Sequence, residues 1–90
     1  MLIISYDIKN NKLRTAFAKK LEELGAVRFQ YSVFEARNSS RILDNLRLVI
    51  KENFAPKFTP ADSVVIFHVN EEKTEKYGNA VHRDKDLNFF

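Results

Sequence analysis

The sequence predicts a small α+β domain in which two helices cover one face of an antiparallel sheet. Two amphipathic segments alternate with short apolar segments in the order β-α-β-β-α-β along a chain of 90 residues. The chain has only two glycines and two prolines, which disfavours long linkers, and its length predicts a single domain. A strand pair between two helices is typical of the ferredoxin-like sandwich.

Residues 2–8, "LIISYDI", predict the first strand, which is apolar on both faces and carries Asp7 near its end. Residues 26–37 are rich in β-branched and aromatic side chains and predict either one long strand or two. We favour two, with a turn or bulge near Gln30–Ser32. The last strand is expected over residues 62–69, "DSVVIFHV".

Residues 11–24 and 40–53 have the apolar spacing of amphipathic helices. Asn10 or Asn11 is expected to cap the first segment, and Ser39 or Ser40 the second. Gly25 supplies the left-handed residue with which many helices end. The expected buried stripes are Leu13, Phe17, Leu21 and Leu24 in the first helix, and Ile42, Leu43, Leu46, Val49 and Ile50 in the second.

The domain core is expected within about residues 1–70, followed by a polar tail over 71–90 that ends in Leu87, Phe89 and Phe90. Both helices cover the same sheet face, so the apolar side chains on the other face need a cover. A second copy related by a two-fold axis is the simplest cover, which predicts a homodimer. The end of the tail is expected to add an edge strand, to its own sheet or to that of the partner.

The charge of the chain is uneven. Residues 1–60 contain 11 Lys and Arg against 6 Asp and Glu, whereas residues 61–90 contain 4 against 6. This basic excess fits a polyanion such as nucleic acid, although a solvated surface explains it equally well. The absence of cysteine excludes a disulfide framework and a thiolate zinc site. No targeting or membrane segment is predicted, because no apolar run approaches about 20 residues, and we expect a cytoplasmic protein.

Asp7 has two interpretations, since an ionised carboxylate at the end of an apolar strand needs a partner. It either accepts backbone N–H bonds from the following loop or binds a hard cation such as Mg²⁺. Lys9, Lys12 and Arg14 follow within seven positions. A carboxylate followed by cations suits a phosphodiester, with metal on the reacting phosphate and basic groups on its neighbours. A solvated basic helix end is the simpler alternative.

Four motifs resemble the Cas-two family of CRISPR-associated endonucleases, in the same order and spacing over about residues 1–70. They are "YDI" at 6–8, Arg14 seven residues after Asp7, "LEELG" at 21–25 and "QYSVFE" at 30–35. The resemblance implies a ferredoxin-like homodimer in which two copies of Asp7 face each other and share Mg²⁺ or another divalent cation such as Mn²⁺. Arg14 matches a basic position that contacts duplex DNA, and Lys9, Lys12 and Arg37 are further predicted nucleic-acid contacts. Ala16 and Phe17 stand where the family often has another basic residue.

The resemblance also implies a function, namely a CRISPR adaptation subunit that binds incoming duplex DNA and bridges the partner integrase during spacer acquisition. Family members have been described as metal-dependent endonucleases on RNA or duplex DNA, which makes Asp7 the candidate catalytic residue. Three alternatives stay open: a non-catalytic DNA-binding scaffold, a stand-alone toxin-type ribonuclease and a small-molecule-sensing domain of the same fold. The sequence does not decide whether the chain cleaves anything.

Overall fold

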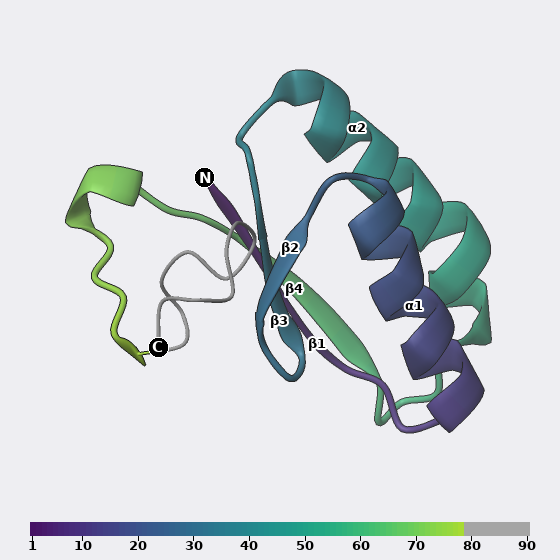
Figure 1. Cartoon of the computed structure of the whole chain (residues 1–90). Coiled ribbons are helices and arrows are strands. Elements are labelled where there is room, and N and C mark those ends of the chain that lie inside the picture. The colour runs from purple at the N-terminus through teal and green to yellow at the C-terminus, as the bar shows by residue number, and fades with distance from the viewer. Residues whose placement is uncertain (79–90) are drawn as a thin grey trace.

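The computed structural model describes residues 1–78 and contains one four-stranded antiparallel sheet with two helices on one face (Figure 1). The order of the strands across the sheet is β2-β3-β1-β4. The strands are β1 (Leu2–Asp7), β2 (Val27–Gln30), β3 (Val33–Ala36) and β4 (Ser63–His68), and the helices are α1 (Asn11–Glu23) and α2 (Ser40–Val49). The predicted ferredoxin-like α+β fold is therefore confirmed.

Helix α1 has the predicted caps and buried stripe. The Asn10 side chain accepts a hydrogen bond from the backbone N–H of Leu13 at 2.9 Å, which satisfies one free donor of the first turn. Gly25 follows the helix with φ of 96°, a conformation in which a residue with a Cβ atom is strained. Phe17 and Leu21 are fully buried against the sheet.

Helix α2 ends earlier than the predicted residue 53. The chain continues as a wider π-helical turn, η1 (Ile50–Phe54), and then as a 3₁₀ turn, η2 (Ala55–Lys57). Within this stretch Phe54 reaches the core, where its ring packs edge-on against Phe17 with centroids 5.0 Å apart. The helical geometry ends beside a proline, which has no N–H to donate to a further turn.

Residues 26–37 form two strands with a tight turn, as favoured from the sequence. The turn lies at Tyr31 and Ser32, and the pairing of β2 with β3 shifts between Arg28 and Gln30, which indicates a bulge.

Side chains alternate along β1 between a covered and an open face of the sheet. Leu2, Ile4 and Tyr6 point toward the helices and are buried, so the residues between them lie on the opposite face. Strand pairing places Val65 and Phe67 of β4 on that opposite face as well, and these side chains remain 45% and 50% exposed. We call this surface the open face. A second copy as its cover stays a prediction.

The chain after β4 runs on the side of the sheet away from the helices (Figure 1). It forms a short 3₁₀ turn, η3 (Glu71–Lys73), and then places the Lys76 ammonium 2.6 Å from both carboxylate oxygens of Glu35. The same ammonium lies 5.8 Å from the centre of the Phe29 ring. The tail thus covers one end of the open face. The predicted edge strand near Leu87, Phe89 and Phe90 lies outside the described residues.

Candidate metal and nucleic-acid site

Asp7 lies at the end of β1 on the open face, with its side chain 63% exposed. Its two carboxylate oxygens are 3.1 and 3.2 Å from the Lys9 ammonium. No backbone N–H within residues 1–78 donates to this carboxylate. The interpretation in which Asp7 caps the following loop is therefore wrong, and its one partner in the described chain is an exposed lysine that a metal ion can displace.

Asp62 performs the capping that Asp7 does not. Its two oxygens accept hydrogen bonds from the backbone N–H of Thr59 at 2.7 Å and of Lys9 at 2.8 Å. These two hydrogen bonds hold the pKa of the Asp62 carboxyl below its ordinary range, and the bond from Thr59 has the larger effect. Asp62 thereby ties the loop after β1 to the loop before β4, and it fixes the backbone two residues beyond Asp7.

Arg14 also holds the loop after β1. Its guanidinium donates to the backbone carbonyls of Ile8 at 2.9 Å and Lys9 at 3.3 Å, and to the Asn11 side chain. Two of its three nitrogens are thus engaged within the chain, and its charge stays beside Asp7. Arg14 therefore positions the loop after β1, whether or not it also contacts nucleic acid.

A cleft of about 600 Å³ brings three of the predicted site residues together. Asp7, Lys9 and Arg14 line it, together with Tyr31 and Ser32 from the β2–β3 turn. It combines a carboxylate, two cations and an exposed aromatic ring, a combination that suits a phosphodiester.

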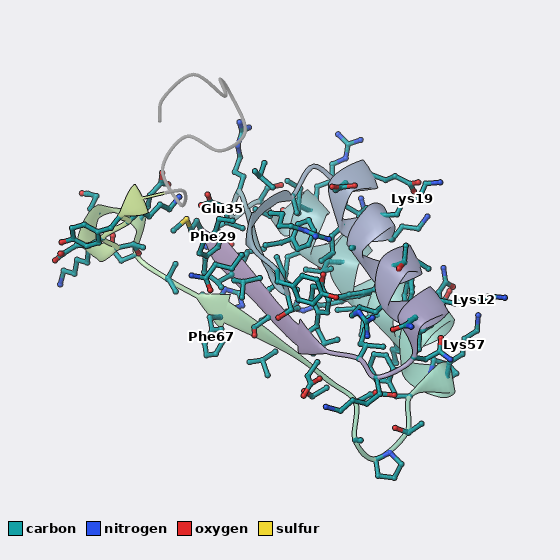
Figure 2. All side chains as sticks on the ribbon, turned by 60° about the horizontal axis from the view of Figure 1, so that its bottom comes forward. Lys12, Lys19, Phe29, Glu35, Lys57 and Phe67 are labelled. Atoms are coloured by element: carbon teal, nitrogen blue, oxygen red, sulfur yellow. The ribbon has the colours of Figure 1, made fainter. Side chains whose placement is uncertain are left out.

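Lys12 lies in a neighbouring pocket of about 440 Å³, together with Lys57 from η2 and Asp62. Figure 2 shows Lys12 and Lys57 at the same end of the molecule, with Lys19 farther along α1. Two lysines from different elements therefore extend the positive charge near Asp7.

Arg37 is not part of this group. It directly follows Ala36, which pairs with Leu2 at the opposite end of β1 from Asp7. Five strand steps of about 3.3–3.4 Å separate those ends by about 17 Å. Arg37 instead lines a pocket of about 380 Å³ with Arg41 and Glu23, between the end of α1 and the start of α2.

The donor set fits half of a site for Mg²⁺. Residues 1–78 contain no cluster of three His, Asp or Glu side chains able to hold a metal, so one chain offers Asp7 alone. Mg²⁺ commonly takes only one or two protein carboxylates and keeps several waters. An exposed carboxylate in a wide cleft meets that requirement once a second carboxylate joins it.

The sequence predictions missed Asp62, Lys57, Arg28 and Tyr31 as residues near this site. Asp62 had a local signal, because Thr59 three positions earlier gives the spacing of a capping box, in which the acidic side chain accepts from the N–H of the threonine. Arg28 also had one, because it is the charged residue between two apolar neighbours in a strand. No helix within the described part of the chain has the length and apolarity to cross a membrane.

Comparison with known proteins identifies the family of this chain. No curated protein matches this chain. The family profile described as "CRISPR associated protein Cas2" matches residues 1–77, a span that contains all four strands, both helices and the Asp7 cleft. The chain therefore belongs to the CRISPR-associated Cas2 family.

Proposed function

We propose that this CRISPR-associated protein is a cytoplasmic adaptation subunit: a homodimer that binds duplex DNA and bridges a partner integrase during spacer acquisition. In this proposal Asp7 from each copy holds one Mg²⁺ or Mn²⁺ and supports endonuclease activity. The observation that carries it is the position of Asp7 on the same sheet face as the exposed Val65 and Phe67.

The geometry of the open face connects dimer formation to the metal site. Asp7 pairs with Ser63, two positions along β4 from Val65, so the carboxylate stands at the end of the exposed apolar row. A two-fold partner that covers this row contributes the same surface in return. Each copy then adds one carboxylate, and two carboxylates with waters are an ordinary Mg²⁺ ligand set.

The chain's own residues have separate tasks in this proposal. Asp7 holds the cation, and Lys9, released from Asp7, is free to contact a phosphate oxygen. Arg14 and Asp62 hold the loop between them in place through its backbone. When bound, the metal ion would activate a water and stabilise the charge that develops on a phosphodiester.

The test is Asp7→Asn, which keeps the size of the side chain and removes its charge. We expect Mg²⁺-dependent cleavage of RNA or duplex DNA to fall by at least about 100-fold, with duplex binding largely retained. Asp44→Asn is the matched control, because Asp44 is 75% exposed on α2 and its one ion pair within residues 1–78 is with Arg47, at 3.9 Å. Equal cleavage by Asp7→Asn and wild type would remove Asp7 from the catalytic role.

A non-catalytic scaffold is the second candidate, and the Asp7–Lys9 ion pair favours it, because the carboxylate is satisfied without metal. A spacer-integration assay with the proposed partner integrase separates the two. Integration retained by Asp7→Asn identifies a scaffold, whereas integration lost with cleavage identifies an enzyme. RNA cleavage without any integrase partner would point to the toxin-type ribonuclease.

A further inference from the structure

A pocket of about 380 Å³ lies between the end of α1 and the start of α2, at the opposite end of the sheet from Asp7. Two arginines line it, Arg37 from the loop after β3 and Arg41 from the first turn of α2. The backbone that carries them is fixed, because the Ser39 N–H donates to the Arg37 carbonyl at 2.9 Å. The two guanidinium groups are therefore attached to a rigid corner of the fold.

Neither arginine has an anion within the described part of the chain. No ion pair in residues 1–78 includes Arg37 or Arg41. Two carboxylates are near enough in the fold or in the sequence to be candidates, Glu23 in the same pocket and Asp44 three positions after Arg41. Each is instead paired with a cation of its own helix, at 3.1 Å for Glu23 and 3.9 Å for Asp44. The positive charge of the pocket is thus left for an external partner.

The rest of the lining is not basic. Leu24 and Ile42 are half-buried, pack against the core and form an apolar part of the pocket. Asn45 adds an amide and Glu23 adds a carboxylate. The pocket therefore offers cations, an apolar contact and hydrogen-bond acceptors together.

This mixture favours a peptide over the backbone of a nucleic acid. Phosphates gain chiefly from Lys and Arg, so Glu23 opposes them and the apolar lining adds nothing to their binding. An acidic peptide uses both kinds of group, because its carboxylates pair with the arginines and an apolar side chain covers Leu24 and Ile42.

We propose that this pocket docks an acidic segment of a partner protein. Asp or Glu side chains of the segment bind Arg37 and Arg41, whose planar guanidinium groups match a carboxylate with two parallel hydrogen bonds. A neighbouring apolar side chain of the segment contacts Leu24 and Ile42. The pocket is lined by the helices, on the side of the sheet away from the open face, so docking needs neither Asp7, nor a metal ion, nor a second copy.

The experiment titrates a short synthetic peptide of alternating Glu and Leu, with blocked ends, into isotope-labelled protein in EDTA and follows the backbone amides by NMR. We expect the amides of residues 37–42 and of Leu24 to shift in a saturable manner. A peptide with Ala in place of each Leu should bind more weakly, because it lacks the apolar contact. A short DNA duplex, titrated in the same buffer, tests whether any polyanion is sufficient.

Arg37→Gln and Arg41→Gln should each lower the affinity for the Glu-Leu peptide by about two- to fivefold, as expected for exposed ion pairs, and the double variant by about the product. Lys51→Gln is the matched control, because it removes one exposed positive charge from η1, beyond the other end of α2. Both arginines are exposed, so the variants should fold, and circular dichroism checks this.

Three results would each overturn the docking site. In the first, the Glu-Leu peptide leaves the amides around the pocket unmoved, or binds the double variant as tightly as wild type. In the second, the Glu-Ala peptide binds as tightly as the Glu-Leu peptide. In the third, the DNA duplex shifts the same amides and the double variant loses this effect, which would make the pocket a nucleic-acid surface. Asp7→Asn should bind the Glu-Leu peptide as wild type does, so loss of its cleavage activity leaves the docking site standing.

Discussion

Replacing Phe67 with alanine should weaken self-association strongly while leaving the fold of each chain intact. Phe67 is 50% exposed on the open face, so it contributes little to the core of a single chain. Burial of a phenylalanine removes about 150–250 Å² from water, which leaves about 100 Å² per copy for a partner to cover. At about 25 cal/mol per Å², this is about 2.5 kcal/mol per copy.

A two-fold interface contains this side chain twice, so the substitution removes about 5 kcal/mol of association free energy at most. Since about 1.4 kcal/mol changes an affinity tenfold, the dimer Kd should rise by up to roughly 4,000-fold. Ordering costs and the remaining alanine methyl reduce the measured value.

Sedimentation velocity over a range of concentrations measures this Kd for wild type and variants. Leu48→Ala is the matched control, because Leu48 is 53% exposed on α2, away from the open face. A wild-type protein that stays monomeric at every concentration would refute the reasoning, as would equal weakening by Leu48→Ala.

Three further predictions concern single residues. Lys9→Ala removes an exposed cation that competes with metal for Asp7, and an exposed ion pair of this kind contributes about 0.2–1 kcal/mol. The Mn²⁺ affinity, followed by NMR line broadening, should therefore rise by up to about fivefold. An equal rise in Lys12→Ala would contradict the pairing of Lys9 with Asp7. Asp62→Ala should lower the melting temperature at neutral pH. Because hydrogen bonds lower the folded pKa of Asp62, its stabilisation is fully present above the ordinary value of 3.8 and fades as pH falls through the folded pKa. A melting-temperature difference that grows on acidification would exclude this role. Phe17→Ala removes the ring at the centre of the core and should lower the free energy of unfolding, measured in urea, by about 3–5 kcal/mol. A loss below about 1 kcal/mol would contradict this and show that the neighbouring side chains fill the cavity.

Local spacing in the sequence was sufficient for most of the fold. The periodicity of Phe17 and Leu21, the asparagine cap and Gly25 depend on residues within one or two turns, and the structure confirms them. The exception is the end of α2, where the core position of Phe54 accompanies a wider turn. Whether the chain makes this wider turn depends on contacts of Phe54 with Phe17, which lies 37 positions away in the chain.

The candidate site could be predicted only in part. Asp7 was identified from a carboxylate at the end of an apolar strand, and Lys9, Lys12 and Arg14 from their nearness to it in sequence. The structure gathers these four near one end of β1 and leaves Arg37 at the other end, because β3 runs antiparallel to β1.

The sequence by itself determined the elements, their order, the α+β class and the strand-end aspartate, because these follow from residue types a few positions apart. Only the tertiary structure decided the partner of each charged group. It assigned loop capping to Asp62 instead of Asp7, and it placed Arg28, whose buried Nε has no hydrogen-bond partner within residues 1–78, beside the Asp7 cleft. The physical reason is that hydrogen bonds and ion pairs are short-ranged, and strand pairing decides which distant residues come within their reach.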